Sequence, residues 1–180
     1  MSRKPSEKGF SLIEVMVAGV ILAVGLLGLA YVYGIGTMDV VYSQQMAIAR
    51  QKAREAVEDI MAARTTATLT WDQINNVSNG GVFLDGAQPL KNPGPDGIVD
   101  TADDGTSALV PEFDSIIVPG ANGLISSGNG TAEALSNFTR QVQITSINSD
   151  LKQITVTITY VTPRGVTRSY QMSCYVSPYV

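Results

Sequence analysis

The feature that most constrains this chain is a run of 24 residues without a charge, which extends from Val15 to Met38. As an α-helix, the run would be about 36 Å long, enough to cross the roughly 30 Å hydrocarbon core of a bilayer. We therefore expect a membrane-spanning segment. A cleavable secretory signal is the alternative, but its apolar core has only about 7–15 residues. Here the run is longer, and residues 39–64 continue the helical pattern beyond it.

The residues before this run indicate its orientation. Arg3, Lys4 and Lys8 outnumber the single acid Glu7, and short basic flanks remain in the cytoplasm. The sequence therefore predicts that the chain beyond the membrane segment is exported.

Glu14 precedes the uncharged run and is the only charged residue between Lys8 and Asp39. An ionised side chain inside a bilayer helix costs roughly 2.5–3.5 kcal/mol on insertion scales, so such residues usually face a partner. The alternative is an interfacial side chain that reaches back to the lipid headgroups. On this residue alone, both interpretations stay open.

The residues around Glu14 form a recognisable pattern. The segment Lys8-Gly9-Phe10-Ser11-Leu12-Ile13-Glu14-Val15 resembles the processing site of type IV prepilins and type II secretion pseudopilins. It combines a short basic leader, a glycine, an aromatic residue, a glutamate four residues later and a long apolar helix. Residues 14–30 are most similar to the PilV-type minor pilins. The resemblance implies that prepilin peptidase cuts between Gly9 and Phe10 and that Phe10 becomes N-methylphenylalanine.

The same resemblance gives Glu14 a role in assembly. Cleavage would create an α-amine on Phe10, and α-amines are largely protonated at neutral pH because their reference pKa is about 7.7–8.0. Glu14 of an incoming subunit would pair with the Phe10 amine of a neighbour and neutralise two charges that are costly in lipid. The implied partners are other pilin subunits through the N-terminal helix, the prepilin peptidase/methyltransferase, the inner-membrane assembly platform and, before assembly, membrane lipid.

The resemblance also implies a location. Before assembly the chain would be a single-pass inner-membrane protein with an exported C-terminal head, and afterwards part of a pilus (fimbrium) at the cell surface or of a periplasmic pseudopilus. Major pilins usually carry a proline in the membrane helix, whereas none occurs between Pro5 and Pro89. We expect a minor pilin for surface adhesion or motility. A minor pseudopilin of a type II secretion system and a signal-anchored exported binding domain are the alternatives.

Small residues inside the membrane segment suggest close helix packing. Gly19 and Ala23 form a small-xxx-small pair, a pattern that lets helix backbones approach each other. Glycine is generally frequent in membrane helices, so the pair has an ordinary explanation as well.

Periodicity predicts an α+β fold that matches the pilin resemblance. In residues 39–65, apolar residues recur at helical spacing at Met46, Ala49, Ala53, Val57 and Ile60. Residues 141–147, 154–162 and 166–176 alternate apolar and polar side chains, as half-buried antiparallel strands do. We expect the sheet to cover the helix stripe. The predicted organisation is a removed leader at 1–9, a transmembrane half-helix at 10–38, an amphipathic half-helix at 39–65, a loop-rich region at 66–136 and an antiparallel sheet of about three or more strands at 137–180.

The loop-rich region contains an acidic segment, 92–104, that can be aligned on a twelve-residue calcium loop. Gly97 falls at the sharp turn, but Gly94 at position three leaves one ligand missing. A solvated acidic turn is the alternative, because Asp, Asn, Gly and Pro are ordinary turn formers. We expect a structural calcium ion as the cofactor. Its predicted oxygen ligands are Asn92, Asp96, the Ile98 carbonyl, Asp100, Asp103 and Asp104.

Composition argues against an enzyme. The chain has no histidine, which removes the usual hydrolase triads, and it lacks a phosphate-binding glycine loop. A carboxylate pair drawn from Asp85, Asp114 or Glu133 is the remaining enzymatic option, and nothing in their spacing singles them out. The net charge of −4 becomes more negative without the leader, which argues against nucleic acid as a partner. Cys174 is the only cysteine, so we expect a buried free thiol.

Overall fold

The computed structural model describes residue 9 and residues 11–118, 131–162 and 164–179. The chain divides into two compact units, Met1–Tyr42 and Ser43–Val180. Helix α1 (Leu12–Thr65) begins in the first unit and ends in the second. Phe10 and the predicted leader residues before Gly9 lie outside the described residues.

In the first unit, α1 exposes apolar side chains on every side. Leu12, Ile13, Leu27 and Leu29 are each about two-thirds exposed or more, and no residue of the unit is buried in the described part. The helix is long and apolar enough to cross a membrane by length and composition. A helix that is apolar all round needs surroundings that are also apolar, such as lipid or other helices.

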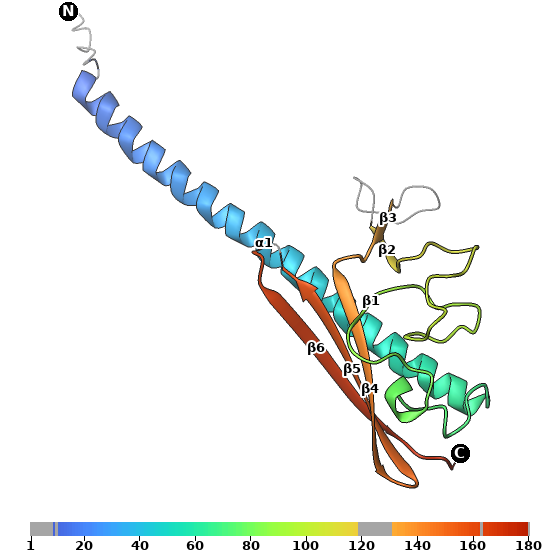
Figure 1. Ribbon diagram of the computed structural model, residues 1–180. Helices are drawn as coiled ribbons and strands as arrows, with labels where there is room; N and C mark the ends of the chain where they lie inside the picture. The colour runs from blue at the N-terminus through green and yellow to red at the C-terminus, as the bar shows by residue number, and fades with distance from the viewer. Residues whose placement is uncertain (1–8, 10, 119–130, 163, 180) are drawn as a thin grey trace, which may run out of the picture. The chain divides into compact units, whose positions relative to one another are not determined.

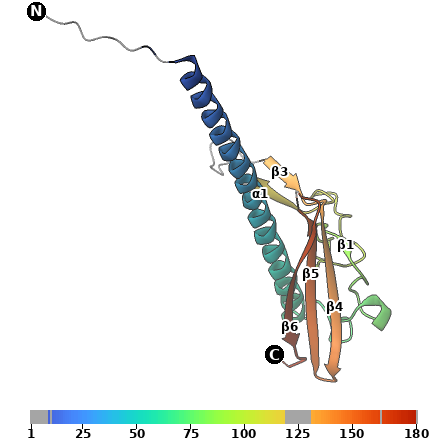
Figure 2. The same cartoon turned by 90° about the vertical axis from the view of Figure 1, so that its left-hand side faces the viewer.

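The second unit contains a four-stranded antiparallel sheet in the order β1-β4-β5-β6. Its strands are β1 (Gln88–Pro89), β4 (Phe138–Asn148), β5 (Leu151–Val161) and β6 (Thr167–Val176). Figures 1 and 2 show β4, β5 and β6 side by side as one layer, with the second half of α1 as the other layer. The expected α+β arrangement of helix and antiparallel sheet is confirmed.

Alternation along the strands builds the interface with the helix. Along β5, even-numbered residues from Lys152 to Tyr160 are buried and odd-numbered ones are half-buried. Ile154, Val156 and Ile158 pack in one core with residues of α1. The helix contributes mostly small side chains, which let the sheet come close: Ala49, Ala53, Ala56, Ile60 and Ala63.

The loop-rich region is more ordered than its composition indicated. It contains the short 3-10 helix η1 (Val77–Asn79) and a separate two-stranded sheet of β2 (Ser115–Val118) and β3 (Thr131–Ala134). It also supplies part of the core: Leu69, Ile74, Phe83, Leu90, Ile98, Val99 and Leu135. Figures 1 and 2 show this region along the β4 side of the sheet.

Candidate functional site

Glu14 lies in the first turn of α1. The backbone amides of Glu14 and Val15 both donate to the Ser11 carbonyl, at 3.0 and 3.2 Å, so the helix begins immediately after the predicted cleavage site. A carboxylate in the first turn interacts favourably with the positive end of the helix dipole. Glu14 is exposed, as is Gly9 just before the helix. Its predicted partner group, the amine of Phe10, lies outside the described residues.

The glycines of the first unit have no packing role within the described part of the chain. A Cβ atom added at Gly19, Gly25 or Gly28 would meet nothing within 4 Å. Glycine costs about 1 kcal/mol relative to alanine in the interior of a soluble helix. The open space at these glycines is therefore available to helices of other chains.

The acidic loop of the second unit is held by tight backbone turns. Gly97 and Asp100 have positive φ values of 70° and 66°, and the Gly97 amide donates to the Gly94 carbonyl at 3.0 Å. A Cβ atom at Gly94 would overlap the Asp103 carboxylate. The missing ligand at position three thus has a steric reason, because only glycine leaves room for Asp103.

Four of the predicted ligands converge on one hydroxyl group. The Thr101 Oγ1 atom lies 2.7 Å from Asp103 Oδ1, 3.2 Å from the Ile98 carbonyl, 3.3 Å from Asp104 Oδ1 and 3.5 Å from Asp96 Oδ2. Thr101 is buried, and a hydroxyl has a single proton to donate. Three carboxylates and a carbonyl around one donor form an oxygen-rich group of the kind that hard cations prefer.

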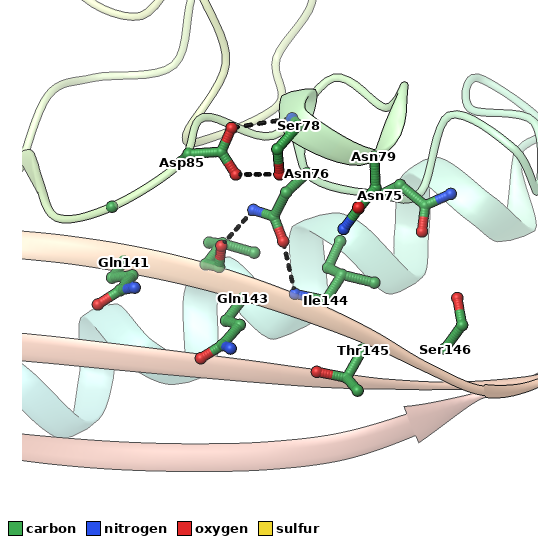
Figure 3. A pocket seen from close by; sticks show the side chains of 12 residues that line it. Asn75, Asn76, Ser78, Asn79, Asp85, Gln141, Gln143, Ile144, Thr145 and Ser146 are labelled. Carbon is green, nitrogen blue, oxygen red and sulfur yellow. Dashed lines mark hydrogen bonds between the residues drawn. The ribbon is translucent and has the colours of Figure 1, made fainter.

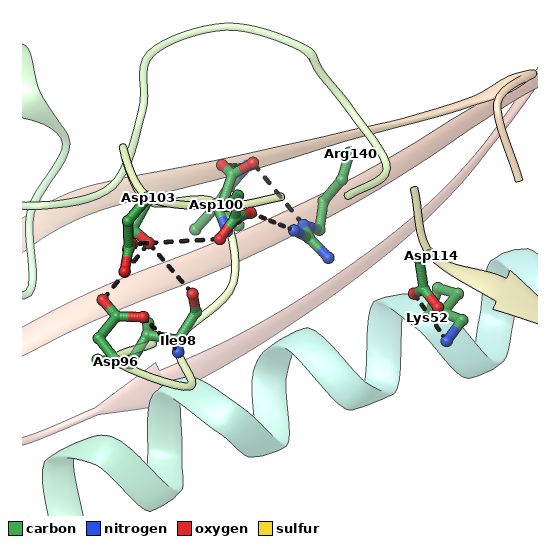
Figure 4. A network of polar contacts seen from close by, with 10 residues as sticks. Lys52, Asp96, Ile98, Asp100, Asp103, Asp114 and Arg140 are labelled. Carbon is green, nitrogen blue, oxygen red and sulfur yellow. Dashed lines mark hydrogen bonds and ion pairs between the residues drawn. The ribbon is translucent and has the colours of Figure 1, made fainter. Parts of the chain in front are cut away.

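Two of the predicted carboxylate ligands, Asp104 and Asp100, contact a buried cation of the protein, Arg140. Arg140 Nη2 lies 3.0 Å from Asp104 Oδ2, and Arg140 Nε lies 3.7 Å from Asp100 Oδ1 (Figure 4). The Val142 amide donates to Asp100 Oδ2 at 3.1 Å. Burial, which outweighs the nearby guanidinium, raises the pKa of Asp100 to about 6 and also raises the pKa of Asp104. Arg140 therefore fastens the loop to β4 and supplies part of its counter-charge.

The predicted ligand set does not come together as a whole. The Asn92 side-chain amide donates to the carbonyls of Pro111 and Phe113, at 2.8 and 3.0 Å, and Asp100 faces Arg140 and Val142. Within the described ranges, no group of three or more His, Cys, Asp or Glu side chains is arranged to hold a metal ion. The donors that do converge are those around Thr101. Thr101 and Arg140 were both missed from the sequence, since neither is an acid in the loop alignment.

Two of the carboxylates considered for an enzymatic pair, Asp85 and Asp114, have separate partners. Asp85 accepts from the Ser78 amide and hydroxyl, at 2.9 and 2.8 Å. Asp114 lies 2.8 Å from Lys52 Nζ, which also contacts Glu55 (Figure 4). Burial opposes ionisation of Lys52, but the Asp114 and Glu55 carboxylates outweigh it and raise the pKa of Lys52. These contacts fasten loops to the core.

Comparison with known proteins gives one match. Residues 4–30 match the family model described as the prokaryotic N-terminal methylation motif. No curated protein and no solved structure matches the chain. The match covers only the N-terminal part, including the predicted cleavage site and Glu14. It supports a type IV pilin-like or pseudopilin precursor, a class of structural subunits rather than enzymes.

Proposed function

We propose that this chain, whose residues 4–30 match the N-terminal methylation motif, is a minor pilin subunit of a type IV pilus. The observation that carries the proposal is the position of Glu14. It is the only charge between Lys8 and Asp39, it lies in the first turn of α1, and it follows the predicted new N-terminus by four residues.

In this proposal, processing precedes assembly. Prepilin peptidase cleaves between Gly9 and Phe10 and methylates the Phe10 amine, while the subunit is held in the inner membrane by the first part of α1. The carboxylate of Glu14 then pairs with the Phe10 amine of a neighbouring subunit at the assembly platform. Pairing is favourable because each charge alone would be costly in the apolar surroundings of the helices.

The remaining surface of the first unit suits packing among subunits. Its apolar side chains are exposed on all sides, and Gly19, Gly25 and Gly28 have open space around them. Together with Ala23, these positions allow neighbouring helices to approach closely. The filament would use this unit for stacking and the second unit for display, in surface adhesion or motility.

A minor pseudopilin of a type II secretion system is the second candidate. The same motif and the absence of proline from α1 fit it equally well. A signal-anchored binding domain differs from both candidates, because it predicts that Gly9 and Glu14 are dispensable.

A structural calcium ion in the acidic loop is also part of the proposal. The convergence of Asp96, Asp103, Asp104 and the Ile98 carbonyl on Thr101 supports it. Asn92 and Asp100 would stay with their protein partners. When bound, the ion would supply positive charge to oxygens that share one hydroxyl proton, and the loop would be more rigid as a result.

Mass spectrometry of assembled material tests the processing step. We expect the first residue to be Phe10 with a methyl group on its α-amine. An unprocessed Met1 leader in assembled filaments would contradict the proposal. A variant with Gly9→Val, which places a branched side chain at the cleavage site, should keep the leader and be absent from filaments.

A further inference from the structure

The second unit contains a polar groove along β4 that none of the functions above uses. It has a volume of about 560 Å³ and lies between residues 75–86 and the strand. Figure 3 shows Gln141, Gln143 and Thr145 along β4, with Ser78 and Asp85 on the facing segment. The polar side chains on which the argument rests are Asn75, Ser78, Asn79, Gln141, Gln143 and Thr145.

The walls of the groove are fixed by buried hydrogen bonds. The Asn76 side-chain amide donates to the Val142 carbonyl, and its oxygen accepts from the Ile144 amide, both at 2.8 Å (Figure 3). Asn76 is 6% exposed, so it replaces a neighbouring strand at this edge of the sheet. These two bonds fasten the facing segment to the edge of β4.

Several side chains in the groove keep their hydrogen-bonding capacity. Within the described part of the chain, the side chains of Asn79, Gln141, Gln143 and Thr145 take part in no hydrogen bond. Asn79, Gln143 and Thr145 are exposed, and Gln141 is half-buried. Amides and hydroxyls both donate and accept hydrogen bonds, as the hydroxyl groups of sugars do.

The charge of the groove excludes most other ligands. Asp85 is the only charged residue among those that line it, and both of its carboxylate oxygens already accept from Ser78. The lining contains no Lys or Arg to bind a phosphate, a sulfate or an acidic sugar. It also contains no aromatic side chain and little apolar surface, which small apolar ligands require.

The neutral character continues from the groove over the outer face of the sheet. Two rows of side chains cross the sheet from β4 through β5 to β6. The first row is Gln141, Thr157 and Gln171, and the second is Gln143, Thr155 and Ser173. All odd-numbered residues in 139–145, 153–161 and 167–175 are uncharged. A ligand longer than the groove would meet further hydroxyl and amide groups there.

An extended peptide fits this place less well. Peptides that add a strand to a sheet need free backbone groups at its edge. Here the Val142 carbonyl and the Ile144 amide are bonded to Asn76, and the Val142 amide is bonded to Asp100. With these backbone groups occupied, binding would rest on the free side chains, which favours a ligand with many hydroxyls.

We propose that the groove between residues 75–86 and β4 binds a neutral glycan, a chain of uncharged sugars, through amide and hydroxyl side chains. The proposal does not depend on filament assembly, because all of the groove residues lie in the unit Ser43–Val180.

Titration calorimetry of the full chain in a detergent without a sugar headgroup tests the proposal. The probes are neutral tetrasaccharides (cellotetraose, maltotetraose and N-acetylchitotetraose), with the acidic tetragalacturonate and an uncharged threonine- and valine-rich decapeptide as comparisons. We expect at least one neutral tetrasaccharide to bind, and tetragalacturonate and the decapeptide to show no binding.

Matched variants locate the site. Gln143→Ala and Asn79→Ala, on opposite walls, should each weaken binding roughly fivefold for each hydrogen bond lost. Gln51→Ala removes the same kind of amide from an exposed position on α1, away from the groove and from the outer sheet face, and should leave the affinity unchanged. Circular dichroism checks that the variants are folded, as expected for exposed side chains. Failure of all neutral tetrasaccharides to bind, equal binding of tetragalacturonate or the decapeptide, or an unchanged affinity of both groove variants would overturn the proposal.

Discussion

At the scale of single residues, the chain uses polar groups in two opposite ways. Glu14 is an exposed carboxylate in an apolar helix, so its purpose depends on something outside the chain. Asn76 and Arg140, in contrast, are buried and bonded to groups far away in the sequence. A buried polar group that loses its partner costs about 1–3 kcal/mol. Asn76 satisfies both ends of its amide, whereas Arg140 bonds through Nη2 and its Nε has no hydrogen-bond partner among the described residues.

Replacing Glu14 by Gln tests whether charge matters for assembly. Gln keeps the size of the side chain but cannot pair electrostatically with an amine. We expect the variant to insert into the membrane and lose its leader normally, but to be incorporated into filaments at least tenfold less. Quantitative immunoblots of membrane and sheared filament fractions measure both quantities.

Glu58→Gln is the matched control, since Glu58 is an exposed acid on the same helix that pairs with Arg54 at 2.7 Å. Exposed pairs of this kind contribute at most about 1 kcal/mol, so assembly should be unaffected. Wild-type incorporation of the Glu14 variant would remove the docking role.

At the scale of elements, α1 has two different surfaces along one helix. Its first part is apolar on all sides, whereas residues from Ala49 onward bury one stripe of mostly small side chains against the sheet. The acidic loop is the second segment with an unusual property, because it holds several carboxylates close together. It brings Asp96, Asp103 and Asp104 near one hydroxyl, and like charges this close repel each other unless a cation is present.

Calcium titration tests that loop. We expect calcium to raise the melting temperature of the wild-type chain, with magnesium less effective because it demands a stricter geometry. Asp103→Asn should abolish the shift, while Asp85→Asn, an acid outside the loop, should leave it intact. If wild-type protein shows neither binding heat nor a change in melting temperature, the ion has no place in the loop.

At the scale of the whole molecule, the buried core belongs to one unit. Every core residue of the described chain lies between Ala49 and Val176, within the unit that begins at Ser43. Buried apolar area is the main source of stability. The first unit therefore adds nothing to the described core.

A fragment that begins at Ser43 should consequently fold alone. We expect it to be soluble without detergent and to unfold in one cooperative transition, followed by circular dichroism during urea denaturation. A fragment that begins at Val57 lacks Ala49, Lys52, Ala53 and Ala56 and should not unfold cooperatively, because the sheet loses most of its cover. A Ser43 fragment that aggregates or unfolds gradually would show that the first unit is needed for folding.

Patterns that are local in the sequence were sufficient to predict much of the secondary structure of this protein. The uncharged run, the isolated Glu14 and the alternation in β4, β5 and β6 can be read directly, because each is a pattern of consecutive residues. A run long enough to cross a bilayer and the two-residue period of a half-buried strand are both local signals. The resemblance around Gly9 and Phe10 is also local, and the motif match at residues 4–30 supports it. The loop alignment was local too. Three of the acids that it named, Asp96, Asp103 and Asp104, lie around the Thr101 hydroxyl, and their role as calcium ligands stays a prediction.

Only the tertiary structure decided which polar groups face each other. Asn76 reaches β4 across 66 residues of sequence, and Asp100 reaches Val142 across 42. No periodic pattern records such pairs, because they depend on how loops fold back onto the sheet. For the same reason, the sequence by itself determined the long apolar helix and the alternating strands of this protein, whereas the convergence on Thr101 and the neutral groove beside β4 exist only once those elements have packed together.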